Sequence, residues 1–372
     1  MRYRIEKDSL GKKQIPAEAY YGIGAFRSKD TFQITKHGLC RQMIKALSVI
    51  KKSAVKANAD LKLINPDVAE AISLSCDEII NGRLHGQFIT DVIQGGSGAS
   101  MNTNANEVIA NRANEMLGGE KGKYNFVHPT KDVNLGQNTG DVILLAGKIT
   151  TIRLTKKLLT EAKKLYNAYF EKIGEYGLSK DIALTLGQEL ASFAHALERD
   201  MKRIDTALGG LHEIRLSYTR EDRQIDDEFI EKSIKYLSMY SGENFYQTKN
   251  IYDNGRNLDA ITWISSALKI MSSNLAKAAS DLVLIAQEGK ITIPQKIEET
   301  TSPVVIEMIQ QVSYYIMGND LTISRSVEGG ELDGNIFYPI IFACMFEIIN
   351  LLRRASRIFR EKVIEVLIVN QL

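Results

Sequence analysis

The sequence of 372 residues contains little cysteine, little proline and little net charge. Its three cysteines, Cys40, Cys76 and Cys344, are far apart and odd in number. They exclude a disulfide framework and a zinc pattern, and they predict a protein of the reducing cytoplasm. With only 6 prolines, a Pro-rich linker is not expected. A net charge of +2 gives no electrostatic reason to expect binding to nucleic acid or to an anionic membrane.

The sequence also has no apolar run of the length that a membrane span requires. The most apolar stretch, residues 338–352, contains Glu347 and is shorter than the roughly 20 residues of a bilayer-crossing helix. The N-terminal segment is charged and has no apolar core of a signal peptide. The five histidines are scattered without ligand spacing, so we expect no metal and no cofactor.

Apolar residues recur at three- and four-residue spacing along most of the chain, which predicts an all-α protein. The predicted helices cover residues 39–60, 66–82, 104–117, 141–173, 183–208, 260–289, 304–317 and 336–352. The polar segment 212–250 is predicted to be a loop with a short helix near 226–238. A helix of about 30 residues is roughly 45 Å long. Such helices cannot be buried within one small domain, so they predict a long bundle that packs against partner subunits.

Two segments resemble the aspartase/fumarase superfamily. Residues 94–119 read QGGSGASMNTNANEVIANRANEMLGG and are similar to its first signature block. Residues 4–28, RIEKDSLGKKQIPAEAYYGIGAFRS, are similar to the start of bacterial aspartases and class II fumarases. The resemblance continues to about residue 362. It implies an all-α fold with a long five-helix bundle that assembles into a tetrameric helical core.

The same resemblance implies a division into domains. Residues 1–136 correspond to a mostly helical N-terminal domain, and residues 137–352 correspond to the central long-helix bundle. Residues 353–372 would be a truncated remnant of a small C-terminal domain that the superfamily usually has.

In this superfamily, three conserved regions from three subunits form one cleft, which performs anti elimination across a Cα–Cβ bond. A base removes a proton next to a carboxylate, and hydrogen-bond donors stabilise the aci-carboxylate that forms. In the first region the resemblance places Ala99 where the family has a carboxylate-binding threonine. Ser100 and Asn102 remain as candidate binding residues. Alternatively, they occupy a turn and cap the helix that follows.

The second region, HPTKDVNLGQNTGD, departs further from the family pattern. Gly136 and Asn138 stand in place of two serines, and Gly140 stands in place of an asparagine. Thr139 and Asp141 persist from the family pattern. The resemblance therefore implies Asn138 and Thr139 as candidates for substrate binding.

A third set of candidates comes from the segment where the family has Gly-x-Thr-His. Tyr176 and Gly177 stand in place of the threonine and the histidine. Tyr176 lies four residues before Lys180, so the two could form a new polar pair on one helical turn. The glutamate that partners the family histidine survives as Glu307, unless that residue simply faces water.

The last region lacks the family signature Gly-Ser-Ser-x-Met-Pro-x-Lys-x-Asn. The corresponding segment, residues 291–305, reads ITIPQKIEETTSPVV. Thr300 and Ser302 occupy the lysine and asparagine positions, and the serine base is missing. Because an oriented base contributes a factor of about 10² to 10⁴, these losses predict that ordinary turnover has been abolished.

The replacements favour a superfamily member that has lost ordinary aspartate ammonia-lyase or fumarase activity and acts as a pseudoenzyme, scaffold or partner subunit. One alternative is a repurposed lyase for a less anionic substrate. Another is residual C–N lyase activity on aspartate. The candidate cleft residues are Ser100, Asn102, Asn138, Thr139, Tyr176, Lys180 and Glu307. We expect a homotetramer, alone or mixed with an active family member, that can bind a small molecule.

Overall fold

The computed structural model describes residues 2–176, 186–217, 226–294, 304–332 and 334–370. The chain divides into two compact units. Unit 1 comprises Met1–Thr150, Leu211–Leu258 and Ser326–Ala343, and unit 2 comprises Thr151–Gly210, Asp259–Arg325 and Cys344–Leu372. Each unit draws on segments that are distant in the sequence. The domains expected at 1–136, 137–352 and 353–372 stay a prediction of the family resemblance.

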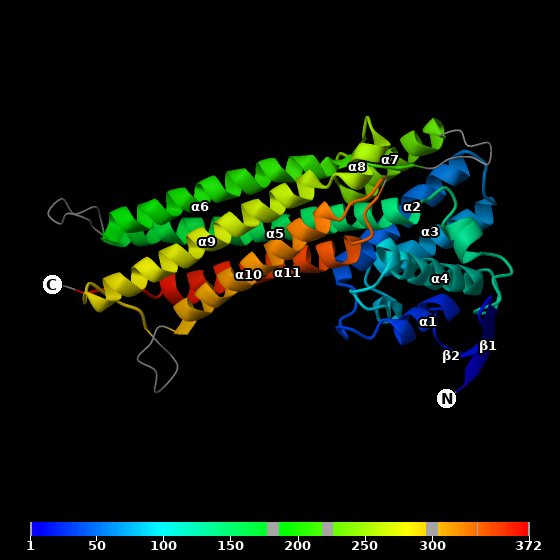
Figure 1. Cartoon of the computed structure of the whole chain (residues 1–372), viewed down its shortest axis with the longest axis horizontal. Helices are drawn as coiled ribbons and strands as arrows, with labels where there is room; N and C mark the ends of the chain where they lie inside the picture. The colour runs from blue at the N-terminus through cyan, green and yellow to red at the C-terminus, as the bar shows by residue number, and fades with distance from the viewer. Residues whose placement is uncertain (1, 177–185, 218–225, 295–303, 333, 371–372) are drawn as a thin grey trace. The chain divides into compact units, whose positions relative to one another are not determined.

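Unit 1 is mainly helical. Its longer helices are α1 (Ile23–Thr31), α2 (Arg41–Asp60), α3 (Pro66–Ile80), α4 (Ala99–Met116), the first part of α5 (Thr139–Tyr176) and α7 (Asp227–Ser241). Short helices are His85–Gln87, Gly96–Gly98, η3 (Pro129–Val133) and α8 (Ile251–Arg256). The strands β1 (Tyr3–Asp8) and β2 (Gly11–Pro16) form an antiparallel hairpin, and β3 (Glu213–Ile214) pairs in parallel with β4 (Tyr246–Gln247). Helix α2 packs against α3, α4 and α7 (Figure 1).

A buried carboxylate fixes the start of α1 to α4. Glu107 of α4 accepts hydrogen bonds from the backbone N–H groups of Gly22, Gly24 and Ala25 at 2.8, 2.8 and 3.1 Å. Burial raises the pKa of Glu107 to about 7, although the three N–H donors act in the opposite direction. A Cβ atom on Gly22 or Gly24 would come within 3 Å of this carboxyl group. Gly22 and Gly24 of the YYGIG segment are therefore required because the backbone passes too close to the Glu107 carboxyl group to leave room for a side chain.

Unit 2 is built from long helices. They are the rest of α5, α6 (Leu186–Gly209), α9 (Asp259–Gln287), α10 (Val304–Glu328) and α11 (Tyr338–Phe359), whose first residues belong to unit 1. Shorter elements are η5 (Arg360–Ile364) and the antiparallel strands β5 (Ile291–Thr292) and β6 (Ile368–Val369). The short helix Gly210–His212 spans the point in the sequence where unit 2 ends and unit 1 resumes. Helices α6 and α9 lie side by side (Figure 1). Buried Asp320 of α10 accepts hydrogen bonds from Ser265 and Lys269 of α9 at 2.6 and 2.5 Å.

The predicted fold class is confirmed: the structure is mostly helical, with a few small strands. Several boundaries differ from the prediction, and three of them differ by five residues or more: the start of α4, the end of α10 and the end of α11, which continues past residue 352 to Phe359. Helix α4 begins at Ala99 instead of 104, because Gly98, with a φ of 84°, ends the preceding turn. Helix α10 continues past residue 317 to Glu328, because Asp320 and Ile323 continue its buried face. Within the described residues, no helix combines the length and the apolar character needed to cross a membrane.

Candidate functional site

The first turns of α4 and α5 bring two of the signature regions together in unit 1. Gly98, which precedes α4, lies against Ile143 of α5, and a Cβ atom at Gly98 would come to 3.1 Å from that side chain. Asn138 precedes α5, and its side-chain oxygen accepts hydrogen bonds from the backbone N–H groups of Gly140 and Asp141 at 2.8 and 3.4 Å. Asn138 is therefore an exposed helix cap.

Thr139 and Asn102 meet directly. The amide nitrogen of Asn102 donates to the Thr139 hydroxyl oxygen at 3.2 Å and to the side-chain oxygen of Asn134 at 3.0 Å. Asn134 Oδ1 also accepts from Asn106 at 3.3 Å, and Asn134 Nδ2 donates to the Gln137 carbonyl at 3.0 Å. We call Asn102, Asn134 and Thr139 the polar wall.

A lysine supports the polar wall from α2. The ammonium group of Lys51 donates to Asn134 Oδ1 at 2.7 Å. The Lys51 side chain is fully buried, and burial lowers its pKa from 10.5 to about 7. The polar wall is therefore connected to a buried basic group.

Asp141 fixes the start of α5 to the segment after β3. Its carboxylate forms an ion pair with Arg215 at 2.9 Å and accepts hydrogen bonds from the N–H and hydroxyl groups of Ser217 at 2.8 and 2.6 Å. Asp141 and Arg215 are both buried. This pair orients the first turn of α5, which carries Thr139.

The geometry of the polar wall is suited to an anion. The first turn of a helix carries partial positive charge, and in α5 two of its backbone N–H groups already donate to Asn138. Thr139 is the first residue of α5 and is partly exposed. Its hydroxyl oxygen already accepts a hydrogen bond from Asn102, so its proton is available to an acceptor such as a carboxylate. Such an arrangement can bind the carboxylate group of a small molecule.

The structure changes the interpretation of the first region. Asn102 does not cap α4, as the alternative interpretation held, but lies inside the helix and is buried. Ser100 is also in the first turn of α4 and is partly exposed. Capping was predicted because the helix was expected to begin at 104. The earlier start turns Asn102 inward, where its amide joins two helices.

The remaining candidates belong to unit 2 or lie outside the described residues. Glu307 is exposed in the first turn of α10, in unit 2, where a negative charge is favoured by the helix dipole. Tyr176 is the last residue of α5, and the placement of its side chain lies outside the described residues. Lys180, Thr300 and Ser302 lie outside the described residues as well. The pairing of Tyr176 with Lys180 stays a prediction.

Two members of this network were missed from the sequence. Lys51 lies on the same helical face as Ile44, Leu47 and Ser48, at the three- and four-residue spacing of a buried stripe. A lysine within this otherwise apolar and small-residue stripe was the feature of the sequence that could have indicated a buried basic group. Asn134 could not be identified in this way, because its role depends on contacts with α2 and α4.

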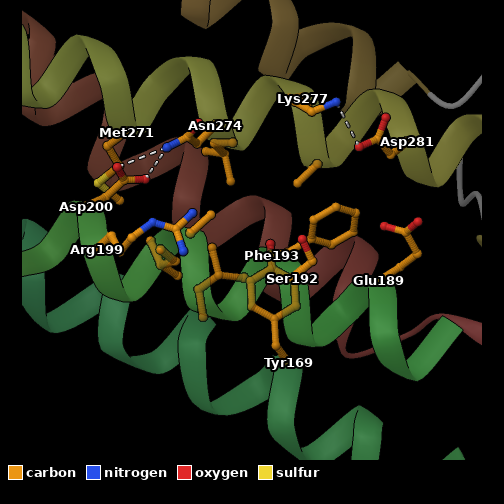
Figure 2. Close-up of a pocket in the computed structure, with 15 residues that line it drawn as sticks. Tyr169, Glu189, Ser192, Phe193, Arg199, Asp200, Met271, Asn274, Lys277 and Asp281 are labelled. Atoms are coloured by element: carbon orange, nitrogen blue, oxygen red, sulfur yellow. Dashed lines mark hydrogen bonds and ion pairs between the residues drawn. The ribbon is translucent and has the colours of Figure 1, made fainter. Parts of the chain in front are cut away.

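A larger cavity lies in unit 2, between α5, α6 and α9, with a volume of about 480 Å³. Figure 2 shows Tyr169 and Phe193 on one side of it and Asn274 of α9 pointing toward Asp200 of α6. The Asn274 amide donates to both Asp200 oxygens at 3.0 and 2.9 Å. Both carboxylate oxygens of Asp200 thus already accept hydrogen bonds. The described residues that line this cavity include none of the binding or catalytic candidates predicted from the sequence.

The chain is similar in sequence to known lyases over most of its length. Residues 11–318 match the sequence profile of a family described as Lyase. The aspartate ammonia-lyase of Bacillus subtilis (strain 168) is 36% identical over 385 residues, which cover 96% of this chain and 80% of that protein. The chain belongs to the aspartase/fumarase superfamily.

Two further similarities support this membership. The aspartate ammonia-lyase of Helicobacter pylori (strain J99) is 33% identical over 399 residues, which cover 99% of this superfamily member and 84% of that enzyme. The crystal structure of fumarate lyase:delta crystallin from Brucella melitensis in native form has a TM-score of 0.93 and 33% identity. That match covers 99% of this chain and 89% of the Brucella chain.

The expectation that this superfamily member has lost ordinary lyase activity is wrong. Relatives named aspartate ammonia-lyase share 33 and 36% identity with it over nearly its whole length, which supports an active lyase. The expectation treated each replaced side chain as an independent loss. In the structure, Thr139 accepts a hydrogen bond from Asn102, which also donates to Asn134, so polar contacts persist although neighbouring residues differ.

Proposed function

We propose that the protein is a C–N lyase that eliminates ammonia from L-aspartate and forms fumarate. The observation that carries this proposal is the 36% identity to the Bacillus subtilis aspartate ammonia-lyase over 96% of the chain. The reaction removes a proton from the carbon next to one carboxylate and breaks the bond between the α-carbon and nitrogen. The electron pair of the C–H bond becomes the second bond of the alkene, the C–N electron pair leaves with the nitrogen as ammonia, and the removed proton ends on this ammonia as ammonium.

The polar wall supports this proposal through substrate binding. Thr139 donates a hydrogen bond from its hydroxyl group to one carboxylate of the substrate. Asn102 fixes the hydroxyl oxygen of Thr139 by donating a hydrogen bond to it. The N-terminal turn of α5 contributes the positive end of its dipole. These groups are oriented before the substrate arrives, which lowers the cost of stabilising charge that develops in the transition state.

A second candidate is a lyase for a less anionic substrate. Ala99, Gly136 and Gly140 have no polar side chain, whereas the family places hydroxyl or amide groups at these positions. A site that lacks such partners gives less stabilisation to a second carboxylate. An amino acid with a neutral side chain, such as L-asparagine or a β-ester of aspartate, would be the preferred substrate in that case.

We also propose that the chain acts as a homotetramer in the cytoplasm. Exposed apolar side chains form stripes on the long helices of unit 2: Tyr314, Met317 and Leu321 on α10, and Trp263, Ile270 and Leu284 on α9. Their spacings of three and four residues on α10, and of seven and fourteen residues on α9, place each set on one helix face. Burial of these faces against other copies would remove apolar surface from water. Cys40, Cys76 and Cys344 are unpaired, as is usual in a reducing compartment.

The test is an ultraviolet assay of fumarate release at high protein concentration. L-Aspartate, L-malate and argininosuccinate are supplied in turn, followed by L-asparagine and aspartate β-methyl ester. Fumarate release from L-aspartate, about tenfold to hundredfold slower in Thr139→Val than in wild type, is the expected result. Ammonia release from the less anionic substrates alone would favour the second candidate. Absence of turnover with every substrate would overturn the lyase proposal.

A further inference from the structure

Lys51 occupies an unusual position for a lysine. Its side chain is fully buried on α2, and its ammonium group has one hydrogen-bond acceptor, Asn134 Oδ1, at 2.7 Å. Within the described part of the chain, no carboxylate forms an ion pair with it. Lysines are almost never fully buried unless they are paired with an acid. The environment of Lys51 is therefore costly for a charged group.

The contacts of Lys51 lead toward the exposed side of the polar wall. Asn134 Oδ1 is shared by Lys51, Asn102 and Asn106, and Asn102 in turn donates to Thr139. Two side-chain amides, those of Asn134 and Asn102, thus separate the buried ammonium from the hydroxyl group of the partly exposed Thr139. The chain of contacts crosses from α2 through η3 and α4 to α5. These elements belong to unit 1, where α2 and α4 pack together (Figure 1).

The interior around this network has unused acceptors. The side-chain oxygens of Asn102 and Asn106 are buried and have no hydrogen-bond donor among the described residues. A buried acceptor without a donor destabilises the folded state, so the network is not arranged for stability alone. A methionine in place of Lys51 would fill nearly the same volume without a charge, and replacing buried ionic groups by apolar ones is often neutral or stabilising.

We propose that Lys51 is a positioning residue for the carboxylate-binding side of the active site. Its buried ammonium fixes Asn134, which fixes Asn102 and the orientation of the Thr139 hydroxyl, and its positive charge adds to the field at Thr139. This inference rests on the proposed function, since it assigns Lys51 to the same site. Lys51 does not touch the substrate and acts through the polar wall.

The groups around Lys51 do not neutralise its charge. Cys76 of α3 is the titratable group whose charge couples to Lys51, and burial raises the pKa of its thiol to about 12, so it stays neutral. The adjacent Lys52 is paired with Asp77 of α3 at 2.6 Å. The groups of α4 and of the residue after η3 that hydrogen-bond in this network are uncharged amides, those of Asn102, Asn106 and Asn134. Helix α7 packs on α2 through the apolar side chains of Phe229 and Ile230.

The test compares Lys51→Met with wild type and with Lys56→Met. Lys56 is a partly exposed lysine of the same helix, α2, and it forms an ion pair with Glu70 of α3. Succinate, a non-reactive dicarboxylate, is titrated by calorimetry at pH 6.5 and pH 8.5. We expect Lys51→Met to fold with an unchanged or higher melting temperature and to bind succinate about three- to tenfold more weakly at pH 6.5. The wild type should lose affinity as the pH rises, whereas Lys51→Met should not.

Kinetics separate positioning from a structural role. For L-aspartate, we expect KM to rise three- to tenfold in Lys51→Met with kcat within about twofold, because binding is weakened in ground and transition states alike. Lys56→Met should match wild type. Equal succinate affinity of wild type and Lys51→Met would overturn the inference, and so would a wild type that binds no succinate. Succinate binding that depends on Lys51, without fumarate release from any substrate, would support the inference while the proposed function fails.

Discussion

The hydroxyl oxygen of Thr139 accepts a hydrogen bond of 3.2 Å from the side-chain amide nitrogen of Asn102, 37 residues earlier in the chain. The bond joins the first turns of α4 and α5. Because an amide N–H can only donate, the hydroxyl proton of Thr139 is free to point toward a ligand. A single contact thus fixes both the position of this threonine and the direction of its hydrogen bonding.

Thr139→Val should therefore impair catalysis with little effect on folding. Valine has the shape of threonine but cannot donate to a carboxylate, and Asn102 keeps its bond to Asn134. A hydrogen bond to a charged group contributes about 1.5–3 kcal/mol, so kcat/KM for L-aspartate should fall about tenfold to hundredfold. Steady-state fumarate assays measure the change. Thr139→Ser, which keeps the hydroxyl, should retain most of the activity; equal rates for wild type and Thr139→Val would exclude the assigned role.

The fold could be predicted from the sequence because helix formation follows local periodicity. The predicted runs at 141–173, 183–208 and 260–289 correspond to α5, α6 and α9. The β1–β2 hairpin was not predicted, since its strands have only one strongly buried position each, Glu6 and Ile15. A pattern of apolar residues cannot reveal a strand whose main inward group is a carboxylate that bonds the backbone of Ile23.

The site could be predicted only in part. Motif resemblance identified Asn102 and Thr139, which the structure joins by a hydrogen bond. It did not identify Lys51 or Asn134, because their roles arise from contacts between α2, η3 and α4 that no local pattern encodes. The loss of activity was predicted wrongly for a related reason. Motif positions were scored one at a time, whereas binding depends on groups that support one another.

The titration of Lys51 should be visible in the pH dependence of stability. Its pKa is 10.5 when exposed and about 7 in the folded protein, so between these values the unfolded chain binds more protons. The free energy of unfolding must then rise with pH across this window, by up to about 1.4 kcal/mol per unit. Below pH 7 both states are protonated, and the contribution is constant.

Urea unfolding at pH 7, 8 and 9 tests this. The unfolding free energy of wild type minus that of Lys51→Met should rise with pH, because the other titrating groups are common to both proteins. A difference that stays constant from pH 7 to 9 would show that Lys51 keeps its proton, contrary to this account.

Two glycines of the same helix, α5, should respond in opposite ways to alanine. A Cβ atom at Gly147 would overlap the ring of Phe342, whereas Gly174 has no neighbouring atom within 4 Å of such a Cβ atom. Gly147→Ala should therefore destabilise the protein by about 1–3 kcal/mol through overpacking. Gly174→Ala should stabilise it by about 0.5–1 kcal/mol, because glycine is unfavourable within a helix. Thermal unfolding of the two variants would contradict the packing argument if their melting temperatures shifted in the same direction.

The exposed stripe on α10 provides the test of assembly. Tyr314, Met317 and Leu321 are 68, 40 and 60% exposed and lie on one face of the helix. If this face packs against another copy, Leu321→Lys places an unpaired ammonium group in an apolar interface, at a cost of several kcal/mol. Size-exclusion chromatography with light scattering should then show the tetramer of wild type replaced by smaller species at micromolar concentration.

The matched control is Leu63→Lys, which makes the same chemical change at a leucine of unit 1 that is 49% exposed. It should leave the tetramer intact. Loss of assembly in both variants would point to general destabilisation, and an intact Leu321→Lys tetramer would remove α10 from the interface. A wild type that is monomeric and well folded at micromolar concentration would overturn the tetramer itself. Since the cleft of this superfamily is expected to draw on three subunits, Leu321→Lys should also lose fumarate release in proportion to the loss of tetramer.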